Sequence, residues 1–361
     1  MSDQKITISN GKLTVPDNPT IPFIEGDGTG PDIWRASQHV FDSAVAKADG
    51  GKKKINWKEV LAGEKSFKKT GNWLPDETLD AFREYLVGIK GPLTTPVGTG
   101  FRSVNVALRK EFELYANVRP TRSIAGVGKF PNVDLVLVRE NVEGLYVGVE
   151  HFVRVGDDPR AVAESMAIVT RVGCERIIRY AFEYAVRNGR KKVTVVHKAN
   201  ILKMVSGLFL EVGRAVAAEY EGRVAFNDLI IDNAAMQMVL RPEQMDVMVT
   251  TNMFGDILSD LAAGLIGGLG LAPGGNIGTH AAVFEAVHGS APDIAGKGVA
   301  NPAALILAGA MMLDHVGEVG AGDRVRAAVA RVIEQDQVRT RDLGGTATTM
   351  EFGDAVVRRI A

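Results

Sequence analysis

Short apolar runs recur along the chain and are separated by longer stretches in which apolar residues repeat with a helical period. The runs are rich in β-branched residues and have the length of buried strands. We predict strands at Thr20–Ile24, Leu86–Lys90, Val133–Val138, Val193–Val196, Leu229–Ile231 and Val247–Thr250.

The intervening stretches predict helices. These run from Pro31 to about Ala48, over Ser103–Leu114, over Ala161–Asn188 and from Phe254 or Gly255 onward; the tail Ala303–Ala361 is mostly helical with a glycine loop at Leu343–Thr346. Proline suits the first position of a helix, and Gly189 is a good stop signal. Alternation of strand and helix predicts an α/β fold with largely parallel sheets.

Two glycine-rich segments interrupt this pattern. Gly26, Gly28 and Gly30 follow the first predicted strand, but they match neither of the common phosphate-loop spacings, so we interpret them as a tight strand-to-helix turn. The segment Gly264–Gly278 is so rich in glycine that we predict a close-approach loop or a hinge there.

Composition narrows the class of protein. A chain of 361 residues suits two domains, and its 46% hydrophobic and 24% charged residues are typical of a globular protein. The net charge of -1 gives no reason to expect nucleic acid or a membrane as partner. The single Cys174 cannot form an intramolecular disulfide, and no apolar run reaches the ~20 residues of a membrane span. The N-terminus lacks the features of a signal or transit peptide, so we expect a cytoplasmic protein.

Candidate metal ligands are three aspartates. Asp256 and Asp260 lie four apart on a predicted helix, hence on one face, and Asp232 ends an apolar strand. Carboxylate oxygens are the ligands that Mg²⁺ and Mn²⁺ prefer, although an isolated pair of this kind is more often a solvated acidic face.

Other candidate residues have equally plain alternatives. Arg109, Arg119 and Arg139 could clamp the carboxylates of a polyanionic substrate, but in a chain with 42 basic residues their positions alone favour ordinary surface charge. Tyr146 and Lys198 could donate and accept protons, or simply pack at strand ends.

The order of motifs along the chain carries more weight than any one of them. The chain resembles the β-decarboxylating dehydrogenases, the family of isocitrate, homoisocitrate, 3-isopropylmalate and tartrate dehydrogenases, from about Ile21 to Ile360. The motifs are Gly-Asp-Gly-Thr-Gly-Pro31, Lys90-Gly-Pro-Leu-Thr-Thr-Pro96, Ser103-Val-Asn-Val-Ala-Leu-Arg109, Tyr115-Ala-Asn-Val-Arg-Pro120, Arg139-Glu-Asn-Val-Glu143, His197-Lys-Ala-Asn200, Asn252-Met-Phe-Gly-Asp-Ile-Leu-Ser-Asp260 and His288-Gly-Ser-Ala-Pro292.

The resemblance implies a two-domain α/β fold with a central cleft that is not a Rossmann fold. It places a large, cofactor-binding domain at 1–114 and 267–361, and a small domain for substrate, metal and dimerisation at 115–266. It also implies a homodimer with shared active sites, in which Lys198, Asn200 and Asp232 come from the partner subunit. Isocitrate would be oxidised and decarboxylated to 2-oxoglutarate, a step of the tricarboxylic acid cycle.

The resemblance also assigns roles to residues. Ser103 and Asn105 match the serine and asparagine with which isocitrate-using members bind the third carboxylate, and Arg109, Arg119 and Arg139 would hold the carboxylates. Asp232, Asp256 and Asp260 would bind Mg²⁺ or Mn²⁺, Lys198 would accept the hydroxyl proton, and Tyr146 would protonate the enolate carbon. Homoisocitrate and 3-isopropylmalate remain alternative substrates, and a non-catalytic regulatory subunit is a further alternative.

Cofactor choice depends on Asp293-Ile294, where NADP-using relatives carry Lys-Tyr. We predict NAD from this pair, because a carboxylate repels a 2′-phosphate. The absence of the C-terminal tyrosine and arginine contacts to NADP in Arg339–Thr346 supports the same prediction. His288 and Asn301 would lie near the adenine, Thr94 and Thr95 near the nicotinamide, and Asn200 would also contact the cofactor.

Overall fold

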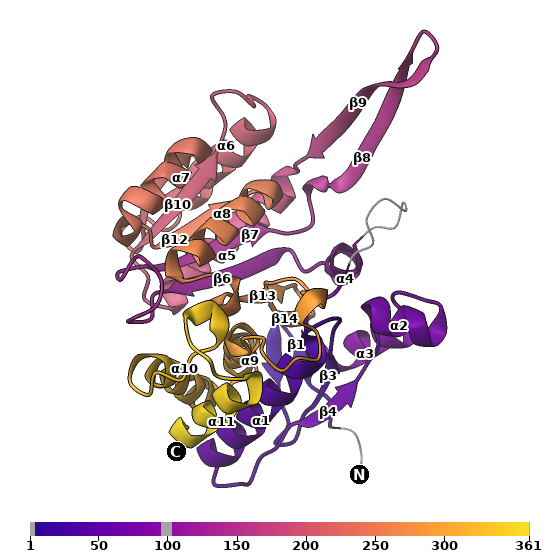
Figure 1. Ribbon diagram of the computed structural model, residues 1–361. Coiled ribbons are helices and arrows are strands. Elements are labelled where there is room, and N and C mark those ends of the chain that lie inside the picture. The colour runs from indigo at the N-terminus through magenta and orange to yellow at the C-terminus, as the bar shows by residue number, and fades with distance from the viewer. Residues whose placement is uncertain (1–3, 95–102, 361) are drawn as a thin grey trace. The chain divides into compact units, whose positions relative to one another are not determined.

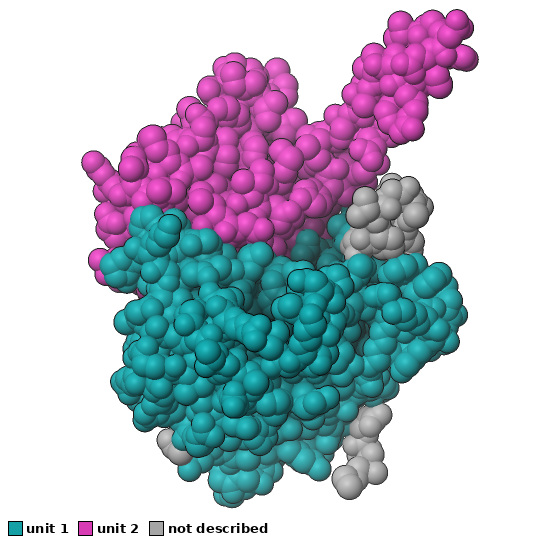
Figure 2. Space-filling view, in the orientation of Figure 1, with its two compact units in different colours: residues 1–114, 122–131, 263–361 teal, residues 115–121, 132–262 magenta. Residues whose placement is uncertain are grey.

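The computed structural model describes residues 4–94 and 103–360 (Figure 1). The chain divides into two compact units, coloured separately in Figure 2. Unit 1 comprises 1–114, 122–131 and 263–361, and unit 2 comprises 115–121 and 132–262. The sequence prediction had placed 122–131 and 263–266 in the central domain; in the structure, the backbone N–H of Ala125 donates to Glu334 of unit 1 over 2.9 Å.

The sheet of unit 1 is mixed. Its strands follow the order β4-β3-β5-β14-β13, with the bounds β3 Thr20–Ile24, β4 Asn56–Glu59, β5 Val87–Lys90, β13 Pro273–Ile277 and β14 Ala282–Ala286. The pairs β3–β4, β3–β5 and β5–β14 are parallel, whereas β13 and β14 form an antiparallel pair. A separate hairpin pairs β1 (Thr7–Ser9) with β2 (Lys12–Thr14).

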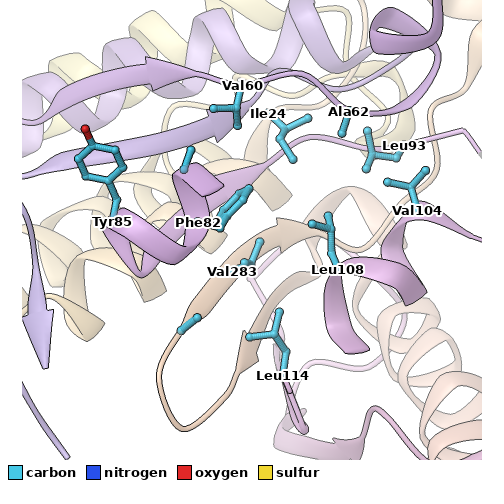
Figure 3. Close-up of a cluster of buried hydrophobic side chains, with 12 residues drawn as sticks. Ile24, Val60, Ala62, Phe82, Tyr85, Leu93, Val104, Leu108, Leu114 and Val283 are labelled. Atoms are coloured by element: carbon cyan, nitrogen blue, oxygen red, sulfur yellow. The ribbon is translucent and has the colours of Figure 1, made fainter. Parts of the chain in front are cut away.

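Helices pack on this sheet and on one another. They are α1 Gly30–Ala48, α2 Gly63–Thr70, α3 Asp76–Tyr85, α4 Val104–Glu111, α9 Ala303–His315, α10 Val319–Glu334 and α11 Thr349–Arg359, with 3-10 turns η2 Leu269–Leu271, η3 Pro292–Ile294 and η4 Arg341–Leu343. Helix α9 contacts β5, β13 and β14 directly, and α1 packs against α9, α10 and α11. A further apolar cluster, which includes Phe82, Leu108 and Val283, joins α3, α4 and β14 (Figure 3). This cluster fixes α4, which carries three predicted substrate residues at or near its ends.

The sheet of unit 2 has the order β11-β10-β12-β7-β6. Its strands are β6 Ala116–Arg122, β7 Asp134–Glu140, β10 Lys192–His197, β11 Ala225–Ile230 and β12 Val247–Thr250. The pairs among β7, β12, β10 and β11 are all parallel, so their carboxyl ends lie at one edge. The helices are α5 Arg171–Arg187, α6 Val205–Ala218, α7 Ile231–Leu240 and α8 Asn252–Ile266, with η1 at Pro242–Gln244; α8 runs on into unit 1.

A long antiparallel ribbon extends from unit 2. Among the described residues, strands β8 (Gly144–Val155) and β9 (Asp158–Ile168) pair only with each other, and they project away from the rest of the unit (Figure 1). The prediction of a helix over Ala161–Asn188 is therefore wrong for its first part, because Ala161–Ile168 is strand and the helix begins at Arg171. The helix-forming alanines there are overridden by cross-strand pairing such as Ala163 with Phe152.

The glycine-rich segment also differs from its prediction. Pro273–Ile277 is a buried strand rather than a loop. A β-carbon added to Gly275 would lie 3.1 Å from the ring of Phe284 and 3.2 Å from Met311, so the glycines leave room for neighbouring side chains. Among the described residues, no helix is long and apolar enough to cross a membrane.

Candidate active site

The carboxylate of Asp256 is the meeting point of several predicted site residues in unit 2. Asp256 lies in the first turns of α8, and its Oδ2 accepts a hydrogen bond of 2.5 Å from the hydroxyl of Tyr146 on β8. Its Oδ1 accepts from Nη1 of Arg139, at the end of β7, and this guanidinium lies 5.2 Å from the centre of the Tyr146 ring. Asn252 holds Arg139 in place by accepting from its Nε and Nη2 over 3.0 and 2.7 Å.

A second arginine reaches the same face of α8. Nη1 of Arg119 lies 3.8 Å from Asp256 and 3.6 Å from Asp260, and it donates to the hydroxyl of Ser259. Its Nε donates to Asn117 over 2.8 Å. Two guanidiniums and two carboxylates therefore share one patch, although the residues alone had favoured the interpretation of the arginines as surface charges.

This patch has a chemistry that suits a divalent cation. Burial raises the pKa of Asp260, Arg119 opposes the rise, and the neighbouring carboxylate of Asp256 adds to it. Two carboxylates one helical turn apart provide oxygen donors of the kind that Mg²⁺ and Mn²⁺ prefer. Within the described part of one chain, no group of three or more aspartate, glutamate, histidine or cysteine residues is placed to hold a metal. Asp232 thus does not join Asp256 and Asp260 in a ligand cluster within one chain.

Asp232 instead pairs with Lys198. The lysine follows β10 directly, Asp232 lies in the first turn of α7, and Nζ of Lys198 donates to Oδ1 of Asp232. This hydrogen bond lowers the pKa of Asp232 below its ordinary value. Asn200 is exposed in the turn after Lys198.

Arg109 belongs to a buried charge cluster in unit 1. Its Nη2 lies 3.1 Å from Glu285, whose other oxygen is 2.6 Å from Nζ of Lys90, and Asn276 donates to Glu285 over 2.8 Å. The glutamate is 4% exposed. Burial alone would raise the pKa of Glu285, but Lys90, Arg109 and Asn276 outweigh it and hold the pKa well below its ordinary range.

Ser103 and Asn105 begin the helix that ends with Arg109. Ser103 is the N-cap residue of α4, and both side chains are partly buried. Oδ1 of Asn105 is buried and has no hydrogen-bond partner among the described residues. A buried acceptor without a donor is costly unless a bound molecule supplies one. The arrangement therefore fits a ligand that reaches Asn105.

Thr94 is fixed by two loops of unit 1. Its backbone N–H donates to the carboxylate of Asp27 over 2.8 Å, and its hydroxyl lies 2.9 Å from that of Ser290. The backbone at Ser290 also lies against Gly28, which has a φ of +59°. Only glycine fits at this position, because a β-carbon there would lie 2.0 Å from the carbonyl oxygen of Ser290. Thr95 falls outside the described residues.

His288 and Asn301 occur near Asp342 in the C-terminal turn η4. Asn301 donates to Asp342 over 2.9 Å, and Nδ1 of His288 is 2.9 Å from the carbonyl of Gly289. The hydrogen of the ring therefore lies on Nδ1, which leaves Nε2 as a buried acceptor with no partner within the described ranges. Burial lowers the pKa of His288, so the neutral ring is favoured. Such an acceptor suits an amino group, as on a purine.

Asp293 and Ile294 lie in the 3-10 turn η3 that follows. Asp293 is exposed, and Ile294 is partly buried. The described structure gives the Asp293 carboxylate no hydrogen bond or ion pair that would fix its direction.

Several residues at these sites had no role in the sequence prediction. Asn252 and Ser259 lie inside a quoted motif, and Lys90 begins another, so their spacing was the available signal. Glu285 is a lone charge in the apolar strand Ala282–Ala286, which itself marks a buried ion pair. Asp27 likewise lies inside the motif that ends at Pro31, whereas Asp342 gave no signal that separates it from ordinary loop residues.

Comparison with known proteins agrees with the fold. The chain belongs to the isocitrate/isopropylmalate dehydrogenase family, which it matches over residues 20–356. Its structure is similar to a crystal structure of isocitrate dehydrogenase from Methylococcus capsulatus, with 56% identity, a TM-score of 0.89 and coverage of 94% of this chain and 99% of that one. A structure of the TT0538 protein from Thermus thermophilus is 42% identical, with a TM-score of 0.90 and coverage of 99% and 72%.

Curated relatives carry cofactor names. A protein of Streptococcus mutans named isocitrate dehydrogenase (NADP) is 43% identical, with 98% of this chain and 99% of the relative covered. One from Staphylococcus epidermidis with the same name is 39% identical over the full length of both chains.

These names contradict the cofactor prediction: the sequence analysis gave an NAD-dependent enzyme, and full-length relatives are named for NADP. The prediction gave Asp293 too much weight. An exposed loop carboxylate can turn away from a bound phosphate, and solvent and salt screen its charge.

Proposed function

We propose that the protein catalyses the oxidative decarboxylation of isocitrate to 2-oxoglutarate and CO₂ with reduction of NADP⁺, in a reaction that requires Mg²⁺ or Mn²⁺. The observation that carries the proposal is the group around Asp256, where Tyr146, Arg139 and Arg119 meet. An acid that can deliver a proton, two carboxylate-binding guanidiniums and metal-competent oxygens are the chemical needs of this reaction. The relatives named isocitrate dehydrogenase (NADP) support the substrate and the cofactor.

Each residue has a role in the proposal. Arg109, Arg119 and Arg139 bind the substrate's carboxylates bidentately, and Ser103 with Asn105 binds the carboxylate that distinguishes isocitrate. In its neutral amine form, Lys198 would accept the proton of the substrate hydroxyl at Nζ, and the nicotinamide of the cofactor, when bound, would take the hydride from the carbon that bears this hydroxyl. The carbon–carbon bond to the β-carboxylate then breaks, CO₂ departs, and the hydroxyl of Tyr146 protonates the carbon left behind.

Asp256 and Asp260 would hold the divalent cation, together with Asp232 of the partner subunit. When bound, the cation supplies Lewis-acid polarisation of the substrate's oxygens. His288, Asn301 and Thr94 would hold the cofactor. The unpartnered Nε2 of His288 supports a hydrogen-bond donor on the adenine.

We further propose a homodimer that shares its active sites. Two surfaces of unit 2 support it. The β8–β9 ribbon exposes Phe152 at 50% and Met166 at 58%, and a two-stranded ribbon is only marginally stable alone. In the segments that follow Lys198 and Asp232 along the chain, Met204 is 82% and Leu240 64% exposed. Apolar surface of this extent is typical of an interface between subunits. We expect the dimer in the cytoplasm.

Initial-rate kinetics on the purified protein would test the reaction. We expect turnover of isocitrate with Mg²⁺ and a higher kcat/KM with NADP than with NAD. Homoisocitrate and 3-isopropylmalate are the matched substrates. If either were turned over faster than isocitrate, it would become the proposed substrate. If none of the three were turned over, the regulatory-subunit alternative would be left.

Subunit mixing would test the shared sites. Lys198→Met and Tyr146→Phe should each be nearly inactive alone. After unfolding and random reassociation, a mixed dimer would carry one intact site, so roughly a quarter of wild-type activity should return. No recovery, in a sample shown by light scattering to contain dimers, would contradict sites built from both subunits.

A further inference from the structure

His197 is buried at the end of β10, immediately before Lys198. It is 5% exposed, and each of its ring nitrogens lies close to a polar atom of the protein. Nδ1 accepts a hydrogen bond of 3.0 Å from the backbone N–H of Ala199, two residues further along the chain. Nε2 lies 3.4 Å from Oδ2 of Asp228 on β11.

These contacts fix the tautomer of the ring. A nitrogen that accepts from a backbone N–H carries no hydrogen, so the ring is neutral and its hydrogen lies on Nε2, directed at Asp228. Oδ1 of Asp228 in turn accepts from Arg214 over 3.0 Å. The strand register places Asp228 opposite Val195, which precedes His197 by two residues on the same face of β10, so Asp228 is the diagonal cross-strand neighbour of His197.

The bond to Ala199 bridges Lys198. It closes a short ring that begins at the side chain of residue 197 and ends at the N–H of residue 199, with Lys198 as the residue between them. The carbonyl of Lys198 also accepts from Ile201 and Leu202 over 3.0 and 2.9 Å. The backbone of Lys198 is thus held on both sides, and Nζ is directed to Asp232.

We propose that His197 is a positioning residue for Lys198, and that it acts through Nδ1 in the way that an asparagine acts in an Asx turn. In such a turn the side-chain oxygen accepts from the N–H two residues on. Asp228 keeps the ring oriented, but the contact that directs the lysine is the one to Ala199. This inference rests on the proposed role of Lys198 in proton transfer.

Two substitutions separate the two ring nitrogens. His197→Asn places an oxygen near the position of Nδ1, and His197→Gln places its polar end near the position of Nε2. We expect His197→Asn to keep kcat within about threefold, and His197→Gln to lower kcat about tenfold or more. KM for isocitrate and for NADP should stay unchanged in both, because lysine orientation affects the chemical step.

Thermal stability separates positioning from packing. Equal losses of kcat and of Tm in both variants would overturn the proposal, as would loss of folding in both. Retained activity in His197→Gln with loss in His197→Asn would also overturn it, since the contact to Asp228 would then be the important one. If only His197→Gln fails to fold, the kcat of His197→Asn decides: a kcat within about threefold of wild type supports the proposal, and a larger loss overturns it.

Failure of the proposed function would look different. In that case the wild type would not turn over isocitrate, or Lys198→Met would keep its activity. If Lys198→Met were inactive while His197→Gln were fully active and stable, the positioning role of His197 would be wrong and the proposed function would stand.

Discussion

Gly255 lies directly beneath Arg139, and a β-carbon at residue 255 would come within 2.5 Å of the arginine's Cγ and 2.7 Å of its Cβ. The arginine passes over the helix at this point on its way to Asn252 and Asp256. A glycine in the middle of a helix costs about 1 kcal/mol relative to alanine, so this close approach has a stability cost.

We predict that Gly255→Ala displaces Arg139 and raises the KM for isocitrate about tenfold or more. Gly264→Ala is the matched control in the same helix, because a β-carbon there meets nothing within 4 Å. The control should keep its activity and gain up to about 1 kcal/mol in free energy of unfolding. Unchanged KM in Gly255→Ala would show that the helix can shift to accommodate the methyl group.

Tyr146→Phe removes the hydroxyl that bonds to Asp256. If this hydroxyl delivers the final proton, kcat should fall about a hundredfold while KM for isocitrate changes little. Tyr184→Phe, in the aromatic pair with Tyr180, is the control and should keep wild-type rates. A Tyr146→Phe enzyme with normal kcat would exclude the hydroxyl as the proton donor.

Removal of divalent cations should abolish activity, and added Mg²⁺ or Mn²⁺ should restore it. Asp260→Asn weakens one of the two oxygen donors on α8, so we expect about tenfold more Mg²⁺ for half-maximal rate. Titration of Mg²⁺ at saturating isocitrate measures this directly. Asp323→Asn, whose carboxylate contacts Arg326, should leave the titration unchanged. Full activity in the presence of excess chelator would contradict the metal requirement.

Glu285→Gln leaves Lys90 and Arg109 buried without their counter-charge, which typically costs about 3–5 kcal/mol. Because the pKa of Glu285 is lowered in the folded state, its contribution is fully present above the unfolded pKa of about 4.3 and is lost as the pH falls below it. The stability gap between wild type and variant should therefore be widest at neutral pH and narrow on acidification.

Urea unfolding at several pH values measures this gap. Glu64→Gln is a suitable control, since its partner Lys68 is 70% exposed and such surface pairs contribute less than about 1 kcal/mol. A gap that is constant with pH would mean that shape rather than charge holds the cluster together.

Much of the strand pattern could be predicted from sequence. The strands Thr20–Ile24 and Val247–Thr250 have the predicted bounds, because a buried parallel strand reads as a continuous apolar run. Pro273–Ile277 could not be predicted in this way. Its glycines have low strand propensity, but the segment pairs with β14 along its whole length, and Gly275 leaves room for Phe284 and Met311.

The site was less predictable than the fold. Spacing on a helix placed Asp256 and Asp260 on one face, and this is a local property of the chain. The pairing of Glu285 with Lys90 and Arg109 joins three distant segments, which a single sequence does not reveal. The prediction of NAD as the cofactor failed for a related reason. The identity of one loop residue, Asp293, does not indicate which other groups would surround a bound phosphate.

Unit 1 is built from chain segments on both sides of unit 2, and this has a consequence for synthesis on the ribosome. Strand β5 cannot pair with β14 until Ala282, the partner of Val87, has been made. Helix α1 likewise cannot pack against α9, α10 and α11 until these helices have been made. Unit 2 ends at residue 262, and β14 and α9 begin only at Ala282 and Ala303, so unit 2 is complete in the nascent chain before these partners and can fold first. The apolar face of α1, with Ile33, Val40 and Phe41, would stay uncovered in the meantime. Late unit 1 assembly is therefore the stage at which a chaperone would be needed.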